Sequence, residues 1–248
     1  MPPPPLALSP ALPSELLTYV LTHQIYPTTL LICQPRNVFL TSLLSSIPQP
    51  IQRQPPPPET HLPDPEDEDP PPRHPLLIPT LHQIATSRSV NVVFIPTVSH
   101  LRAYLSVFPP PTENASPPEP KLDKPGKEVP LLVVYGLVDL HRDTSEWSAQ
   151  GFGNSVASLV EAGRRGDRKI VVIEEKKEED SSYVVEGEEV ERKPGWKVWD
   201  ERVPMLNGNI RRAGFESEES AWSGRTIEIG RIYARWFRFG RGDWDLEE

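Results

Sequence analysis

The stretch that follows the apolar run at 29–33 is where this sequence could carry a phosphate-binding loop. Such a loop reads GxxxxGK[ST] between a strand and a helix: its glycines let backbone amides surround the phosphates, its lysine neutralises them, and its hydroxyl holds magnesium. Here the chain reads QPRNVFLT, with Gln34 and Phe39 at the glycine positions and Leu40 at the lysine position. Only Thr41 stays in register, and we expect its hydroxyl to bond within its own helix. The bulk of Phe39 and the missing charge at Leu40 predict no phosphate binding of the usual kind and no nucleotide cofactor.

The apolar run LLVVY at 131–135 is the second place where nucleotide chemistry could reside. A nucleotide-hydrolysing site would end this strand with an aspartate that orders magnesium and water, but Tyr135 stands there. Asp139 follows four residues later, either as a displaced metal ligand or, as we favour, as an ordinary loop aspartate. His141 and the two charged residues after it give no catalytic triad from adjacency alone. We expect no catalytic residue and no metal site, so the sequence is that of a pseudo-ATPase and not of an enzyme.

A surplus of arginine near the end of the chain is the remaining feature that could bind a charged ligand. Between Arg202 and Arg241 eight arginines stand against four carboxylates, in a chain whose net charge is −9. Such a segment either faces phosphate or an acidic partner or, as we favour, forms a solvated face beside core strands. Arginine with exposed aromatics can hold a nucleic-acid strand and stack its bases, although strand alternation favours the core for Trp236 and Phe237. If nucleic acid is bound, the candidate residues are Arg211, Arg212, Arg225, Arg231, Arg235 and Arg238.

The elements that must position these residues alternate along the chain. Short apolar runs followed by amphipathic stretches predict an α/β fold with a mostly parallel sheet covered by helices on both faces. The stretch 226–239 is rich in β-branched and aromatic residues and is expected to be a strand or a hairpin, with Gly230 at a bulge or bend. The expected strands are 29–33, 90–95, 131–135 and 169–173, and the expected helices are 14–24, 40–47, 77–87, 98–108 and 147–164.

Proline-rich and acidic segments interrupt this alternation. The chain of 248 residues contains 32 prolines and only 37% hydrophobic residues. Segments of such composition cannot bury enough apolar surface to offset the entropy of ordering. We therefore expect one domain over 14–240, a disordered N-terminus at 1–13 and a tail at 241–248, with disordered insertions at 48–75, 109–130 and 175–195.

The cysteine content and the hydropathy indicate the cellular compartment of the protein and whether it has a membrane-spanning helix. A single cysteine, Cys33, excludes a disulfide within the chain and a cysteine-rich zinc site, and it favours a reducing compartment. Because it ends an apolar run, we expect Cys33 to be a small core residue. No stretch approaches the length of a membrane helix, so we expect no membrane partner.

The string LLVVYGLVDLHRDTSEWSAQGFGNSVASLVEA, followed by KIVVI, resembles the second nucleotide-motif region of the eukaryotic RecA-type recombinase family. The resemblance is closest to small divergent paralogues of the Shu-complex type, the ATPase-like partners of SWIM zinc-finger proteins. It implies a RecA-like fold of the P-loop NTPase type with degenerate motifs. It also implies a nuclear protein that assists homologous recombination and double-strand-break repair. The implied partners are a SWIM zinc-finger protein or another recombinase paralogue, together with single-stranded DNA.

Two alternatives to this interpretation stay open. RecA-like accessory subunits of Elongator also lack nucleotide motifs and take part in tRNA modification, and a divergent ATPase would use Thr41 and Asp139. The stretch after 169–173 carries a DNA-contacting loop in recombinases, but here it reads EEKKEEDSSYVVEGEEVE and would repel phosphate. Any nucleic-acid contact is therefore expected at the C-terminal arginines. There we expect salt-sensitive binding that weakens when Arg211 and Arg212 become alanine.

Overall fold

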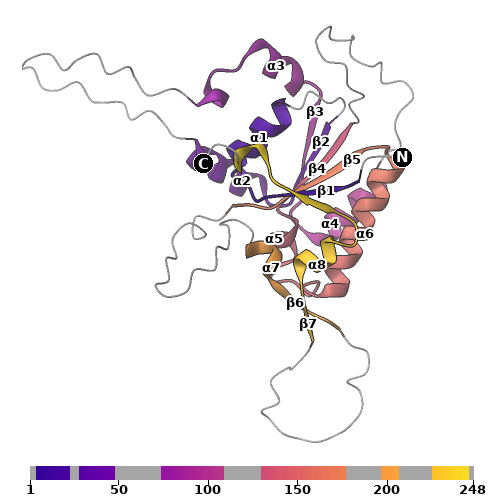
Figure 1. Cartoon of the computed structure of the whole chain (residues 1–248). Coiled ribbons are helices and arrows are strands. Elements are labelled where there is room, and N and C mark those ends of the chain that lie inside the picture. The colour runs from indigo at the N-terminus through magenta and orange to yellow at the C-terminus, as the bar shows by residue number, and fades with distance from the viewer. Residues whose placement is uncertain are drawn as a thin grey trace, which may run out of the picture.

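Six parallel strands form the centre of the fold (Figure 1). The computed structural model describes residues 4–22, 28–47, 74–108, 130–176, 197–206 and 225–245. The spatial order of the strands is β3-β2-β4-β5-β1-β8, and every neighbouring pair is parallel. The α/β class with a parallel sheet is thereby confirmed. The strands are β1 (Leu6–Leu8), β2 (Thr28–Ile32), β3 (Val90–Phe94), β4 (Leu131–Tyr135), β5 (Lys169–Ile173) and β8 (Arg238–Gly240).

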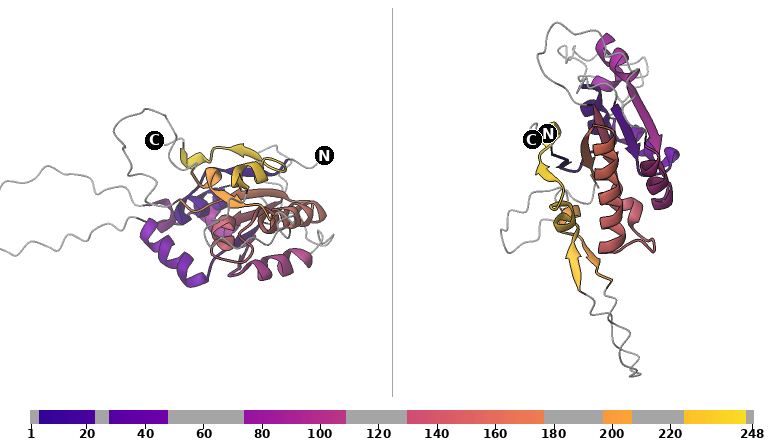
Figure 2. Two further views of the ribbon diagram at one scale, coloured as in Figure 1. Left: turned by 90° about the horizontal axis from the view of Figure 1, so that it is seen from below. Right: turned by 90° about the vertical axis from the view of Figure 1, so that its right-hand side faces the viewer.

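Helices cover both faces of this sheet (Figure 2). On one face α1 (Pro13–Thr22) and α2 (Arg36–Ser46) pack against the sheet. On the other face lie α4 (Val98–Ser106), α6 (Ala149–Arg165) and α8 (Ile229–Tyr233). The remaining elements are the helices α3 (Leu81–Ser87), α5 (Leu137–His141) and α7 (Lys197–Asp200), the 3-10 turns η1 (Pro75–Leu77) and η3 (Asp243–Asp245), and the antiparallel pair β6 (Arg202–Pro204) and β7 (Thr226–Glu228).

The central strands are apolar on both sides because both sides are covered. All five residues of β4 are buried, with Leu132 and Val134 facing α4 and α6 and the alternate side chains facing α1 and α2. Continuous apolar runs of this kind are typical of parallel sheets between two helical layers. The runs predicted at 29–33, 90–95, 131–135 and 169–173 are thus confirmed as strands within a residue at each end.

The expectation of a disordered N-terminus at 1–13 is wrong. Leu6–Leu8 forms β1, an interior strand between β5 and β8, and Ala7 is fully buried. The error has a physical reason. Three apolar residues between prolines show no periodicity, and the pairing partners of β1 lie more than 160 residues away, at Val171 and Arg238.

The C-terminal stretch 226–239 is not a single strand or hairpin. It divides into β7, α8 and the start of β8. Ile229, Ile232 and Tyr233 have the spacing of one helical face and are all buried, so their β-branched and aromatic character misled the prediction. Gly230 lies in α8, not at a strand bulge. A Cβ atom there would stand 3.0 Å from the carbonyl oxygen of Trp199, so glycine permits the close approach of α7.

The three predicted insertions fall almost wholly outside the described residues. At their edges, Pro75 belongs to η1, the Pro130 carbonyl accepts a hydrogen bond from the Lys169 amide, and Glu175 forms an isolated bridge with Ala11. Of the helices in the described part of the chain, none is both long and apolar enough to span a bilayer.

Candidate functional site

Phe39 fills the carboxyl edge of the sheet, where the parallel strands end and open α/β sheets bind their ligands. Pro35 precedes α2, and Phe39 lies in the first turn with only 3% of its surface exposed. Its ring packs edge-on against Phe94 and Tyr135, each with centroids 6.0 Å away. Phe94 and Tyr135 end β3 and β4, so three aromatic rings occupy the space beside β2 where a phosphate loop was sought.

The other residues of the degenerate loop are equally unsuited to phosphate. The Thr41 hydroxyl donates to the Asn37 carbonyl at 3.0 Å, which confirms the expected local bond. Leu40 is 39% exposed and brings no charge. Gln34 follows Cys33, and its side-chain nitrogen is buried without a hydrogen-bond partner among the described residues. Cys33 is buried in the core, as expected.

Tyr135, at the position where a nucleotide-hydrolysing site would have an aspartate, makes a structural hydrogen bond. Its hydroxyl donates to the Ala11 carbonyl at 3.0 Å, within the loop that follows β1. Burial raises the pKa of Tyr135 well above its ordinary value, and the carboxylates of Glu175 and Glu174 raise it further. The phenol therefore stays protonated and ties the end of β4 to the loop after β1.

That loop after β1 is a second strand–loop–helix unit, which the sequence analysis missed. It reads SPALPSE over 9–15 and contains neither glycine nor lysine. Its amides are already engaged, because Ala11 donates to the Glu174 carbonyl at 2.9 Å and Leu12 donates to the Glu15 carboxylate at 2.6 Å. A phosphate would have to compete with both bonds.

The C-terminal turn η3 covers the same loop. Trp244 donates its indole N–H to the Pro10 carbonyl at 3.1 Å and packs edge-on against Tyr19 at 5.8 Å. The Gly242 amide donates to the Ser9 hydroxyl at 2.9 Å. Both loops that lead from a strand into α1 or α2 are thus closed by side chains of this protein itself.

Glu174 is a buried carboxyl at the end of β5, with 1% of its surface exposed. It accepts hydrogen bonds from the Val138 amide at 3.1 Å and from the Tyr233 hydroxyl at 3.3 Å. Burial raises the pKa of Glu174 from 4.5 to about 8, and the nearby charge of Asp139 raises it further. The two hydrogen bonds and Arg142 pull the pKa down. The burial of Glu174 could not be predicted, because this residue opens an acidic run of the kind that is typical of a solvated surface.

A cavity of about 390 Å³ lies at the ends of β4 and β5 beside this carboxyl. Arg142 pairs there with Asp139 at 3.2 Å and with Glu201 at 2.6 Å. Asp139 belongs to α5 and not to a loop, and its carboxylate is held by a cation. No cluster of three or more potential metal-binding side chains occurs in the described ranges. The lining residues are Asp139, Arg142, Glu174, Glu175, Lys197, Val198, Asp200 and Glu201.

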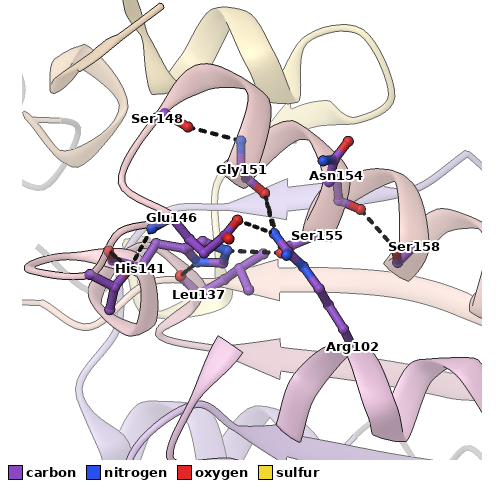
Figure 3. Close-up of polar contacts among 10 residues, drawn as sticks. Arg102, Leu137, His141, Glu146, Ser148, Gly151, Asn154, Ser155 and Ser158 are labelled. Carbon is purple, nitrogen blue, oxygen red and sulfur yellow. Dashed lines mark hydrogen bonds and ion pairs between the residues drawn. The ribbon is translucent and has the colours of Figure 1, made fainter. Parts of the chain in front are cut away.

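A polar network between α4, α5 and α6 was also invisible in the sequence (Figure 3). His141 contacts the Ser155 hydroxyl through Nε2 and the Leu137 carbonyl through Nδ1, both at 2.9 Å. Arg102 donates to the Ser155 hydroxyl at 3.2 Å, to the Gly151 carbonyl at 2.9 Å and to the carboxylate of Glu146 at 2.7 Å. Only the tertiary fold brings these residues together.

The hydrogen-bond partners of His141 determine which of its ring nitrogens carries the proton. The Leu137 carbonyl can only accept, so His141 carries its proton on Nδ1, and Nε2 accepts from Ser155. Burial lowers the pKa of His141 and keeps the imidazole neutral. A serine hydrogen-bonded to a neutral histidine resembles a nucleophile with its base. However, Ser155 and His141 both have 0% exposure, so no substrate reaches them and the network is structural.

The candidate arginines divide into three groups. Arg211 and Arg212 lie outside the described residues. Arg231 pairs with Glu228 at 3.3 Å and is not available to a ligand without breaking that pair. The other three are exposed and form no ion pair with any described carboxylate: Arg225, Arg235 and Arg238.

The two aromatic residues between Arg235 and Arg238 differ in burial. Phe237 is 4% exposed and packs against Tyr233 in the core, so the expectation for Phe237 is confirmed. Trp236 is 44% exposed, so its expected core position is wrong. The period-2 argument failed because these residues follow α8 and do not belong to a strand.

Arg235 and Trp236 together line a groove of about 300 Å³. The groove lies between the first turns of α6, the end of β6, β7 and the end of α8. Arg225 is adjacent, because its carbonyl accepts a hydrogen bond from the amide of the lining residue Met205 at 2.8 Å. The lining residues are Ala149, Gln150, Gly153, Asn154, Met205, Ile227, Ile232, Arg235 and Trp236.

Comparisons with known proteins add little to this geometry. No family model matches the chain, and no curated protein matches it. Among solved structures, it is similar to a chain described as the structure of a DnaB-like replicative helicase and its interactions with primase. The identity is 9% and the TM-score is 0.32, over 75% of this chain and 42% of that chain. The match thus spans less than half of the helicase, and a likeness at this level does not bear on what this protein binds.

Proposed function

We propose that this protein is a RecA-type recombinase paralogue that has lost its nucleotide chemistry and acts without catalysis in homologous recombination. The observation that carries the proposal is the carboxyl edge of the sheet, where Phe39 and Tyr135 occupy the space a nucleotide would need. A fold that keeps a ligand-binding architecture but fills its site is suited to binding other macromolecules. The RecA-type assignment itself rests on the sequence resemblance.

An exposed apolar surface around α2, α3 and β3 supports a protein partner. Leu44 is 63% exposed, Leu81 is 87% exposed, and Val92 is 44% exposed on the outermost strand of the sheet. Exposed apolar side chains and an edge strand are typical of interaction sites. We call the exposed side chains of residues 34–47 and 74–94 the apolar lobe.

The charge of the apolar lobe indicates the kind of partner. The chain has 35 carboxylates, but none of them lies in 28–47 or 74–108, where Arg36 and Arg88 are exposed. An apolar surface with basic residues and no acidic ones favours a partner that presents apolar and acidic side chains. The proposed partner is a SWIM zinc-finger protein or another recombinase paralogue, and the proposed location is the nucleus.

Co-expression with candidate partners tests this function. We expect a complex with a SWIM zinc-finger subunit, and we expect Leu44→Asp with Leu81→Asp to abolish it, because acids replace exposed apolar contacts. Leu206→Asp is the matched control, since Leu206 is 55% exposed and closely follows β6, which lies far from α3 in Figure 1. Recovery of Elongator subunits and not of a SWIM zinc-finger subunit would favour a function in tRNA modification. If the complex still forms after the double substitution, the apolar lobe is not part of the interface.

The exposed arginines near the C-terminus support a further contact with single-stranded nucleic acid. Between Arg225 and Gly242 five arginines stand against one carboxylate, Glu228. Glu228 pairs with both Arg202 and Arg231, so these two arginines already balance its negative charge. The remaining guanidinium groups have no carboxylate partner among the residues that the structure describes, and their attraction to phosphates would depend strongly on salt.

A further inference from the structure

We propose that the groove beside Trp236 seats one unpaired base of a single-stranded nucleic acid, stacked on the indole ring. The inference rests on the proposed nucleic-acid contact and assigns the base-binding part of it. Three features support it: an exposed tryptophan on a fixed backbone, a groove beside that tryptophan, and cationic and amide groups at the rim of the groove, whose arginines pair with no carboxylate among the described residues.

Trp236 is held in place while its ring stays exposed. Its amide donates to the Tyr233 carbonyl at 2.8 Å, and the residues on either side of that turn, Tyr233 and Phe237, are buried in the core. Trp236, 44% exposed as a residue, therefore stands on a fixed backbone. Trp199, by contrast, lies 4% exposed against Tyr233. A fixed aromatic face suits base stacking, because every base has a π-face and little ordering entropy is lost.

Hydrogen bonds hold the walls of the groove together. The Gln150 side chain accepts from the Leu206 amide at 2.9 Å and donates to the Leu206 carbonyl at 3.0 Å, which joins α6 to the end of β6. Gly153 keeps the floor open, since a Cβ atom there would meet only Ile232, at 4.0 Å. With Ile227 on another wall, the space of about 300 Å³ has the apolar lining and small size that fit one planar group.

Polar groups at the rim give the groove its selectivity. The Arg235 guanidinium has no described carboxylate partner, and Arg225 lies beside the groove through its bond to Met205. Asn154 is exposed on α6, and its side-chain amide offers both a donor and acceptors. A cation, an amide and an aromatic plane match phosphate, base edge and base face respectively. An apolar peptide side chain would use the ring alone.

Binding of two fluorescent oligonucleotides, measured by anisotropy with the full chain, tests the inference. One is an oligothymidylate, and the other has the same length and charge but lacks its bases. The variants are Trp236→Ala, which removes the ring, and Gly153→Met, which fills the groove. Gly153→Ala leaves the groove open and is the control for the helix. Arg88→Ala, an exposed position in the apolar lobe, is the control for net charge.

We expect the wild-type protein to bind the base-containing strand about 5- to 150-fold more tightly than the abasic strand, the range that stacking of a base on an aromatic ring supplies. Trp236→Ala and Gly153→Met should erase that difference and leave salt-sensitive binding of the abasic strand unchanged. Equal affinity of the wild type for both strands, or an undiminished difference in both variants, would refute the groove alone. Absence of binding to either strand would refute the proposed nucleic-acid contact itself.

Discussion

At the scale of single residues, the candidate site is determined by side chains that differ in size and charge from those that a nucleotide-binding site needs. In the RecA-type assignment that we propose, Tyr135 stands where a magnesium-ordering carboxylate would stand, and Phe39 stands where glycine would let a backbone reach phosphate. Their bulk and lack of charge can be read from the sequence, and the structure shows that the two rings are buried against each other. Glu174 and the pair His141–Ser155 could not be predicted, since their chemistry depends on partners that only the fold supplies.

Glu174→Gln should change how stability depends on pH. The folded state holds the Glu174 proton with a pKa of about 8 and the unfolded state with one near 4.5, so the folded state binds more protons between these values. Stability is therefore full below about pH 4.5 and falls as pH rises to 8. Glutamine removes this loss and should stabilise the protein on the order of 4 kcal/mol at pH 8.5, with little effect at pH 4.5.

Thermal unfolding across this pH range is the measurement for Glu174. The groups that face its carboxyl are Asp139, Arg142 and the Tyr233 hydroxyl, and they are the same in both proteins. The difference in melting temperature between variant and wild type should therefore grow steadily from pH 4.5 to 8.5. A constant difference over this range would show that Glu174 is ionised in the folded protein.

Ser155→Ala should destabilise the fold by about 1–3 kcal/mol, because it leaves the buried Nε2 of His141 without its partner and removes one hydrogen bond of Arg102. Urea unfolding measures the loss. Ser158→Ala is the matched control on the same helix, where the hydroxyl bonds only to the Asn154 carbonyl one turn back. Its effect should be within about 0.5 kcal/mol. Equal losses for the two variants would mean that the network contributes nothing to stability.

At the scale of elements, the sequence predicts the longer apolar strands. It does not predict the three-residue strands or the helix whose residues also suit a strand. The strands β2, β3, β4 and β5 each have five residues and stand between helical patterns, so they were predictable. The three-residue strands β1 and β8 carry no periodicity and depend on each other and on β5 for their pairing. The stretch that forms α8 combines β-branched and aromatic residues that suit a strand with a spacing that suits a helix, and tertiary packing decided between them.

The interior position of β1 makes a clear prediction for Ala7. Ala7 is fully buried between β5 and β8, so Ala7→Asp places a carboxylate there without a partner and should cost about 3–5 kcal/mol. Asn91→Asp introduces the same charge at an exposed position of the outer strand β3 and should cost little. Urea unfolding followed by circular dichroism compares the two. An Ala7→Asp protein as stable as the wild type would mean that β1 is not part of the sheet.

At the scale of the whole molecule, charge and apolar surface are separated. The apolar lobe at one end carries exposed leucines and no carboxylate, whereas the groove with Trp236 lies at the other end, beside β6 and β7 (Figures 1 and 2). The two proposed binding surfaces, so placed, would allow a protein partner and a nucleic-acid strand to be held at once. Between them lies the carboxyl edge of the sheet, where side chains of the protein pack against one another.

Calorimetric titration of the full chain with magnesium ATP tests the central claim most directly. With Phe39 and Tyr135 occupying the edge, and with the amides of the loop after β1 already bonded, we expect no saturable heat at millimolar nucleotide. The same titration of Thr41→Ala is the control and should be indistinguishable. Stoichiometric binding of magnesium ATP by the wild type that disappears in Thr41→Ala would contradict the account and restore a divergent ATPase.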